Sequence, residues 1–206
     1  MHNFPVVISF YTKHTFYQME VQNLIESCNR FGLEQSIEGV DSFGSWELNC
    51  AYKPFFILQK IKQLQRPVLW VDADGMFVRQ PECIPVFSSD FATRINEECD
   101  DAHPSKVISS TVFANYSEEG VAILEAWAEE CRKALTCETR KEEFWDQVAL
   151  RDAIALKKHS AVIRPLPLSY ARIFDHPHDL KQQEPPVIEH YQASRRFKKF
   201  INNFDD

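Results

Sequence analysis

The chain has 206 residues, 44% of them hydrophobic and 13% aromatic, which is enough apolar material for the core of one domain. The formal net charge of −7 argues against an overall attraction to nucleic acid or to anionic lipid. No apolar run reaches the roughly 20 residues of a membrane span, and no signal peptide is evident, so we expect a single domain over residues 1–206 in the cytoplasm.

The first third of the sequence alternates between apolar, β-branched runs and segments with helical spacing. A predicted helix at 17–31 carries apolar residues every three or four positions and stops at Gly32. A second helix is predicted to begin at Lys53-Pro54, because proline is tolerated in a first turn. The predicted loop is the polar segment 41–49, and the predicted strands are residues 5–11, 36–40 and 68–71.

The second half of the sequence is less regular. A long helix is predicted at 118–135 with Ser117 as its N-cap, and another at 145–156. The tail at 194–206 is first basic and then acidic. Loops are predicted at 96–106 and 136–143, and short strands at 90–95, 107–115, 161–167 and 187–191.

This alternation of strands and helices is typical of an α/β protein with an open, mixed but mostly parallel sheet flanked by helices. Ligands bind such sheets in the crevice at the carboxyl ends of the strands. Asp72 and Asp74 directly follow the predicted strand at 68–71, and Phe10-Tyr11 ends the first strand. These side chains are therefore expected at the ligand-binding edge.

The two aspartates are the most informative feature of the sequence. Charge at the end of an apolar strand is costly unless something compensates it. Mg²⁺ or Mn²⁺ would do so, because hard cations prefer oxygen ligands, and such a cation could hold a diphosphate. Strand alternation would place Asp72 and Asp74 on one face. The alternative is a plain turn, since Asp-Gly at 74–75 is a common turn dipeptide; we favour metal binding.

Histidines near the end of the chain are candidate nitrogen ligands. His190 ends a short apolar run and could complete the shell of the same cation, although a lone histidine is more often structural. His176 and His178 form a rival His-Pro-His pair. We expect their proline-flanked loop to be exposed, and therefore do not favour this pair as ligands.

Asp146, Gln147 and Lys53 each have a functional and a plain interpretation. Asp146-Gln147 opens the predicted helix at 145–156. A carboxylate there is favoured by the helix dipole, but a neighbouring carboxylate and amide also suit sugar hydroxyls. Lys53 could reach a phosphate or simply be solvated.

Aromatic and basic residues add two further candidates. Tyr11 could stack on a nucleobase, whereas core packing is favoured for Phe10. The basic cluster at 194–199 could neutralise the charge of a leaving diphosphate, or it could be a solvated tail.

Signatures of several other classes are missing from the sequence. It has five glycines and neither a Gly-x-Gly-x-x-Gly fingerprint nor a P-loop, which argues against those nucleotide-binding classes. No Gly-x-Ser-x-Gly elbow is present. Without a Cys-x-x-Cys pair, free or buried thiols are favoured over disulfides or a zinc knuckle. The cysteines are Cys28, Cys50, Cys83, Cys99, Cys131 and Cys137.

Taken in order, these motifs resemble a GT-A-type glycosyltransferase, in particular the nucleotide-diphospho-sugar transferases related to glycogenin-like enzymes. The resemblance covers most of the chain, residues 6–198. It rests on Phe10-Tyr11-Thr12, Lys53-Pro54, the apolar strand with Asp72 and Asp74, the segment 110–115 before the Trp127 helix, Trp145-Asp146-Gln147 and Glu189-His190.

The resemblance implies a metal-dependent enzyme that moves a sugar from a nucleotide-diphosphate donor to an unknown acceptor, such as a glycan, lipid or protein, with retention of configuration. It implies that Asp72 and Asp74 bind Mn²⁺ or Mg²⁺ together with the donor diphosphate, and that His190 completes the metal shell.

The resemblance also assigns roles to other residues. Asp146 and Gln147 would contact the donor or acceptor sugar near the anomeric carbon. The nucleoside pocket would be lined by Tyr11 and Thr12, and auxiliary phosphate contacts would come from Lys53 and Lys198.

Two departures from the family pattern keep another hypothesis open. The chain is short for the group, and Gln192-Ala-Ser-Arg195 stands where relatives carry Lys-Pro-Trp. A non-catalytic sugar-nucleotide-binding or scaffold protein is therefore the alternative function. A nucleotidyltransferase is less favoured, because residues 9–18 contain no glycine for a phosphate loop.

Overall fold

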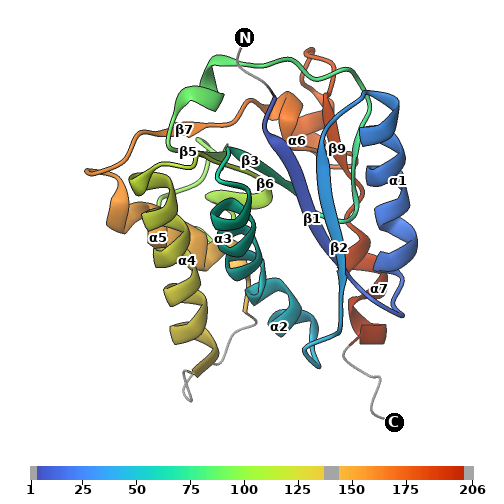
Figure 1. Cartoon of the computed structure of the whole chain (residues 1–206), viewed down its shortest axis with the longest axis horizontal. Coiled ribbons are helices and arrows are strands. Elements are labelled where there is room, and N and C mark those ends of the chain that lie inside the picture. The colour runs from blue at the N-terminus through green and yellow to red at the C-terminus, as the bar shows by residue number, and fades with distance from the viewer. Residues whose placement is uncertain (1–3, 137–143, 202–206) are drawn as a thin grey trace.

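The computed structural model of the protein describes residues 4–136 and 144–201. A six-stranded sheet crosses its centre (Figure 1). In spatial order its strands are β2 (Gln35–Val40), β1 (Val6–Thr12), β3 (Val68–Val71), β6 (Val107–Ala114), β5 (Phe91–Ile95) and β7 (Ile163–Pro165). Only β6 runs against its neighbours; the other pairs are parallel. The predicted α/β class with a mixed, mostly parallel sheet is confirmed.

A smaller second sheet lies beside the first. Its strands, in order, are β4 (Gly75–Phe77), β9 (Ile188–His190) and β8 (Arg172–Ile173). β4 and β9 are antiparallel, and Gly75 lies opposite His190. The late strand is thereby placed next to the segment that carries the two aspartates.

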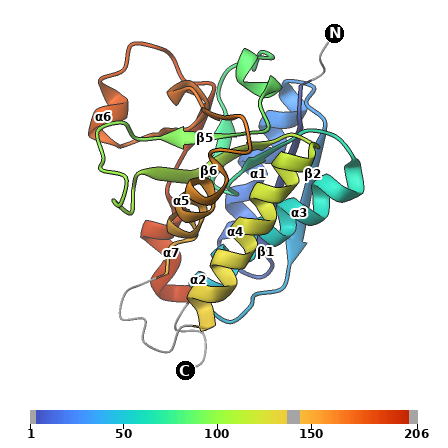
Figure 2. The same ribbon diagram turned by 90° about the vertical axis from the view of Figure 1, so that its left-hand side faces the viewer.

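Helices cover both faces of the central sheet. α3 (Lys53–Leu64), α4 (Glu118–Thr136) and α5 (Asp146–Lys157) lie together on one face, and α1 (Tyr17–Arg30) lies on the other (Figures 1 and 2). The remaining helices are α2 (Trp46–Ala51), α6 (Pro177–Leu180), α7 (Ala193–Ile201) and the short 3-10 helices η1 (Pro85–Ser88) and η2 (Leu168–Tyr170).

Alternation along the strands divides the apolar core into two halves. Side chains at successive strand positions point to opposite faces. Val6 and Ile8 thus join the cluster that contains Trp127 of α4, while Val7 joins the cluster that contains Leu24 of α1. Because both faces of β1 are buried, its sequence is a continuous apolar run.

Most predicted elements are present, but β4, β8, α6, η1 and η2 were not predicted. Two further differences concern segments that were expected to lack helices. α2 begins inside the segment expected to be a loop at 41–49, because the Ser45 side chain caps it by accepting a hydrogen bond from Leu48 N. The basic part of the tail forms α7. At α4, the predicted N-cap is confirmed, since Ser117 Oγ accepts a hydrogen bond from Gly120 N.

Some predictions fall outside the described residues: Cys137, the connection at 137–143 and the acidic end of the tail at 202–206. Within the described part of the chain, Cys28, Cys50, Cys83, Cys99 and Cys131 are free thiols, as expected. None of the helices in residues 4–136 and 144–201 combines the length and apolar character needed to cross a lipid bilayer.

Candidate active site

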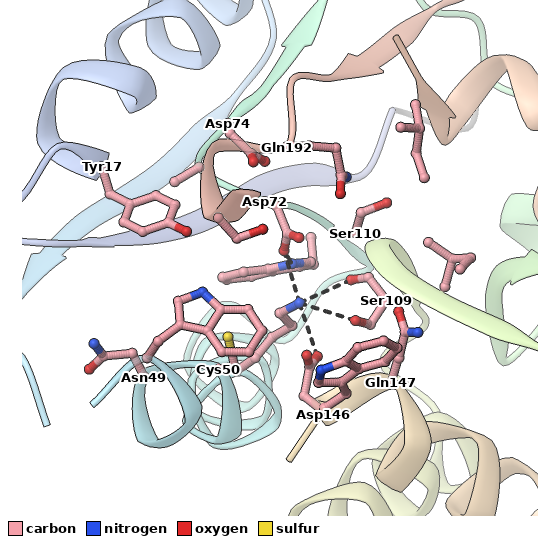
Figure 3. A pocket seen from close by; sticks show the side chains of 18 of the residues that line it. Tyr17, Asn49, Cys50, Asp72, Asp74, Ser109, Ser110, Asp146, Gln147 and Gln192 are labelled. Carbon is pink, nitrogen blue, oxygen red and sulfur yellow. Dashed lines mark hydrogen bonds and ion pairs between the residues drawn. The ribbon is translucent and has the colours of Figure 1, made fainter. Parts of the chain in front are cut away.

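A cavity of about 480 Å³ opens at the edge of the central sheet where β1 and β3 end (Figure 3). β6 runs the opposite way, so its early residues Ser109 and Ser110 reach the same edge. This is the edge at which open α/β sheets bind ligands. Most of the predicted site residues line the cavity: Tyr11, Thr12, Lys53, Asp72, Asp74, Asp146 and Gln147.

Asp72 and Asp74 reach the cavity from a turn rather than from a strand. β3 ends at Val71, and Gly75 N donates a hydrogen bond to Asp72 O at 2.8 Å, which closes the turn. The alternation argument was therefore wrong, although both side chains face the same cavity (Figure 3). The predicted turn is present, and it directs both carboxylates into the cavity; metal binding by them stays a prediction.

Lys53 is the cation that Asp72 and Asp146 share. Its Nζ lies 2.9 Å from Asp72 Oδ1 and 3.0 Å from Asp146 Oδ2. It also donates to the backbone O of Ser109 at 3.3 Å and to Ser109 Oγ at 3.2 Å. The side chain is buried, so the solvated alternative is wrong. Two hydrogen bonds to Ser109 and ion pairs with two carboxylates surround the ammonium, so a phosphate contact would require one of these partners to be released.

Burial and charge act in opposite directions on Lys53. Burial alone would lower the pKa of its ammonium, but the charges of Asp146 and Asp72 outweigh burial and raise the pKa above its ordinary value. The group is therefore positively charged at neutral pH. It compensates part of the negative charge that the cavity wall would otherwise carry.

Asp72 has a second fixed partner. Trp70 Nε1 donates a hydrogen bond to Asp72 Oδ1 at 2.7 Å, so the same oxygen serves Trp70 and Lys53. Burial raises the pKa of Asp72 above its ordinary value, although the charge of Lys53 acts in the opposite direction.

Asp74 is tied to the end of the chain. Its Oδ2 accepts a hydrogen bond from Ala193 N at 2.7 Å, and its backbone O accepts one from Tyr191 N at 3.0 Å. His190 Nδ1 lies 3.9 Å from Asp74 Oδ1. Burial alone would raise the pKa of Asp74, but the His190 imidazole and the Ala193 N–H outweigh it and lower the pKa.

His190 lies behind the aspartates, fully buried. Its Nε2 shares a 2.7 Å hydrogen bond with Thr111 Oγ1, whereas its Nδ1 is buried without a hydrogen bond. Two carboxylates and an unengaged imidazole nitrogen form a donor set that suits Mn²⁺ or Mg²⁺. Because Asp72 is held by Lys53, it would have to turn for all three side chains to reach one ion.

Asp146 and Gln147 are positioned by the start of α5. Trp127 Nε1 donates to Asp146 O at 2.9 Å, which fixes the first turn of α5 against α4. The Asp146 carboxylate is buried and points to Lys53. Gln147 Nε2 donates to Pro104 O at 2.9 Å, so the amide links α5 to the loop at 96–106.

Phe10, Tyr11 and Thr12 form the end of β1. Phe10 packs against Tyr52, Phe56 and Trp70, as the core interpretation predicted. The Tyr11 ring lies against Gly39 of β2, where an added Cβ would come within 2.9 Å of it. Thr12 Oγ1 shares a 2.8 Å hydrogen bond with Thr15 Oγ1.

Three aromatic residues of the cavity wall were given no role from the sequence: Tyr17 and Trp46, and Trp145, which was noted only as part of the Trp145-Asp146-Gln147 motif. Each stands at or next to the first residue of a helix. An aromatic residue at a predicted helix start was therefore the sequence feature that could have marked them as part of the cavity wall. Burial, together with the charge of Asp74, raises the pKa of Tyr17. Arg94 of β5 also lines the cavity and was not singled out. The side chain of Lys198 lies outside the described residues.

Comparison with known proteins gives a fold. No protein-family model matches the sequence, and no curated protein matches it. A crystal structure of a glycosyltransferase involved in the glycosylation of the major capsid of PBCV-1 is similar, with a TM-score of 0.66 at 11% identity over 95% of this chain and 99% of that one.

A second solved structure is the apo form of the glycosyltransferase GlyE from Streptococcus pneumoniae TIGR4, with a TM-score of 0.55 at 14% identity. The similarity covers 98% of this chain and 61% of GlyE, so the chain matches less than two thirds of that protein. At such identities the likeness concerns the fold: the chain has a glycosyltransferase fold.

Proposed function

We propose that the chain transfers a sugar from a nucleotide-diphosphate donor to an acceptor hydroxyl, with a divalent cation and with retention of configuration. The observation that carries the proposal is the convergence of Asp72, Asp74 and Asp146 on one cavity at the carboxyl edge of the sheet. The glycosyltransferase fold supports it. Arg94 and Arg195 of the cavity wall are paired with Asp179 and Asp175. Lys53 is therefore the cation of this wall, among the described residues, that the three carboxylates share, and this balance suits a metal ion and a developing sugar cation.

Asp72, Asp74 and His190 would hold the cation, Mn²⁺ or Mg²⁺. When bound, it would act as a Lewis acid that stabilises the negative charge of the departing diphosphate. His190 Nδ1, which lies 3.9 Å from Asp74 Oδ1 without a hydrogen bond, is the nitrogen available to it.

The proposed reaction breaks one bond to the anomeric carbon and forms another, and two cavity side chains would assist it. The bond between the anomeric carbon and the diphosphate oxygen breaks, and its electron pair stays with the diphosphate. The acceptor hydroxyl oxygen bonds to the same face of the sugar, and its proton passes to the leaving diphosphate. Asp146 would stabilise the oxocarbenium-like charge on the sugar, and Lys53 holds that carboxylate in place.

Binding of the donor would use the other predicted residues. Tyr11 and Thr12, at the end of β1, would line the nucleoside part of the cavity. Gln147 already donates its amide N–H to Pro104, so its oxygen could accept a hydrogen bond from a sugar hydroxyl. A phosphate contact from Lys198 remains part of the proposal.

Donor hydrolysis tests the proposal. UDP-, GDP- and CMP-sugars should first be screened by thermal shift with and without Mn²⁺, since a ligand that binds the folded form raises its stability. With the donor so found, Asp72→Asn and Asp74→Asn should each lower Mn²⁺-dependent hydrolysis by about 10²-fold or more. Asp41→Asn, at an exposed carboxylate, is the matched control. Wild-type turnover in both cavity variants would contradict the mechanism.

The non-catalytic alternative has one observation in its favour. Lys53 and Trp70 both engage Asp72 Oδ1, so a built-in cation already compensates the charge of a proposed metal ligand. A scaffold would bind a sugar nucleotide without Mn²⁺ and would release no nucleotide in long incubations. Calorimetry combined with a nucleotide-release assay separates the two functions.

A further inference from the structure

A second group of metal-ligating side chains lies at the rim of the cavity. His176 lines the cavity, and His178 and Asp179 follow in α6. Among residues 4–136 and 144–201, these three form the set of His, Cys, Asp or Glu side chains whose ligand atoms all lie within 4.8 Å of one another. The predicted exposure of the pair is largely confirmed, since the His176 and His178 side chains are 42% and 40% exposed, but the Asp179 beside them is fully buried.

Two distances within this group are close to those between the ligands of a tetrahedral ion. Asp179 Oδ1 lies 3.2 Å from His176 Nδ1 and 3.7 Å from His178 Nδ1. Ligand atoms bound at roughly 2.0 Å to tetrahedral Zn²⁺ lie about 3.3 Å apart. His176 Nδ1 is buried yet forms no hydrogen bond, so its direction does not suit an N–H···O contact with Asp179. His176 Nδ1 and Asp179 Oδ1 are better placed to bind one metal ion between them.

Neighbouring residues also hold Asp179 and His178 in place from the side away from the proposed ion. Arg94 binds the Asp179 carboxylate through two hydrogen bonds, at 2.6 and 2.7 Å, and Ile173 N donates a third at 2.8 Å. On the other side, His178 Nε2 lies 3.5 Å from Glu98 Oε1. Carboxylates on the far nitrogen of a histidine, and hydrogen bonds to a ligating carboxylate, are common second-shell partners of bound metals.

The charges favour a zinc-class ion over magnesium. Arg94 already compensates Asp179, so the two imidazoles are not needed as its ion-pair partners. The donor set holds one carboxylate and two imidazole nitrogens, which suits Zn²⁺ or another late transition metal better than Mg²⁺, whose preference is for oxygen.

We propose that His176 Nδ1, His178 Nδ1 and Asp179 Oδ1 bind a divalent transition metal of the zinc class at the rim of the cavity, with water from the cavity as a further ligand. This site is separate from the cation proposed at Asp72 and Asp74. Through Glu98 it would join the α6 segment to the loop at 96–106, whose residues Asn96 and Ser105 form part of the same wall.

Cobalt titration of the full-length, chelator-treated protein tests the site, because tetrahedral Co²⁺ with nitrogen ligands has a strong visible absorption. We expect one equivalent of Co²⁺ to produce this absorption and one equivalent of Zn²⁺ to abolish it. His176→Ala and His178→Ala should each weaken Co²⁺ binding more than tenfold, and Glu98→Gln by about tenfold. Circular dichroism checks that each variant is folded.

Two controls give the experiment its specificity. His159→Ala removes an exposed histidine from the connection between α5 and β7 and should leave the titration unchanged. Asp74→Asn should also leave it unchanged, which separates this site from the proposed donor cation and from the proposed function. No tetrahedral absorption in the wild type, or equal Co²⁺ affinity in folded His178→Ala, would overturn the proposal.

Discussion

Lys53 Nζ lies 3.0 Å from Asp146 Oδ2, which joins the first residue of α3 to the first residue of α5 beneath the cavity. Both side chains are buried. An ion pair in such a place costs desolvation on both sides, and removal of one partner leaves an uncompensated charge. The stability of the molecule and the shape of its candidate active site therefore depend on the same contact.

Replacement of Lys53 should expose this dependence. Lys53→Met would leave Asp72 and Asp146 without their shared cation, and we expect the free energy of unfolding to fall by about 3 kcal/mol or more. Lys53→Met combined with Asp146→Asn should recover part of the loss. Urea unfolding measures both. Lys62→Met, at an exposed ion pair with Glu125, should change stability by about 0–1 kcal/mol; an equal loss in the two single variants would refute the argument.

Gly75 should tolerate no side chain. An added Cβ would lie 2.6 Å from Val71 Cγ1, 3.0 Å from His190 Cε1 and 3.1 Å from Asp72 O. Gly75→Ala should therefore push β4 away from β9 and destabilise the protein by about 1–3 kcal/mol. Thermal unfolding tests this, with Ser88→Ala at an exposed position as the control. A melting temperature equal to that of the wild type would show that the turn has room to relax.

The buried pair of Arg94 and Asp179 should make stability depend on pH. Burial alone would raise the pKa of Asp179, but hydrogen bonds from Arg94 and Ile173 outweigh it and lower the pKa. A carboxyl group with a lowered folded-state pKa adds stability that is complete above its unfolded pKa of about 3.9. That stability is lost as the pH falls through the lower folded-state value.

Asp179→Asn tests this dependence. In EDTA at pH 7 we expect the variant to be less stable than the wild type by about 3 kcal/mol, and the gap to narrow below about pH 4. Urea unfolding at several pH values gives the difference. A gap that stays constant down to pH 3 would argue against an ionised Asp179 in the folded state.

Cysteine reactivity should follow burial. Burial raises the pKa of the Cys28 thiol to about 12, and burial likewise raises the pKa of Cys131. Because the thiolate is the reactive form, an alkylating reagent at pH 8 should modify Cys83, the exposed thiol among Cys28, Cys50, Cys83, Cys99 and Cys131, before the other four. Cys28 and Cys131 should react only after denaturant is added. Peptide mass spectrometry reads out each position, and early labelling of Cys28 would contradict the described packing.

The central sheet could be predicted because each of its main strands is long enough to carry its own signal. β1 and β3 are continuous apolar runs, and α1 and α4 show helical spacing with a stop or a cap. The second sheet could be predicted only in part. β9 lies within the strand predicted at 187–191, but β4 and β8 were missed, and the pairing of β4 with β9 is not encoded in local sequence.

The candidate site was predictable in location and less so in geometry. Two aspartates directly after a buried strand indicate the edge of the sheet where the strands end, and this holds for any conformation of the turn that carries them. The burial of Lys53 was not predictable, because it depends on Asp72, Asp146 and Ser109 from three distant segments. Ser45 is a residue type typical of an N-cap, but α2 was not predicted. The residues around it are polar and show no apolar helical spacing.

The hydrogen bond from Ala193 N to Asp74 joins residues 119 positions apart. At a translation rate of about 5–20 residues per second, the acidic turn leaves the peptidyl-transferase centre about 6–24 s before its backbone partner is synthesised. A nascent chain therefore displays its aspartates while the segment that closes this wall is still encoded in untranslated message. A product arrested before β9 would retain the strands of the central sheet but would carry an open, half-built pocket.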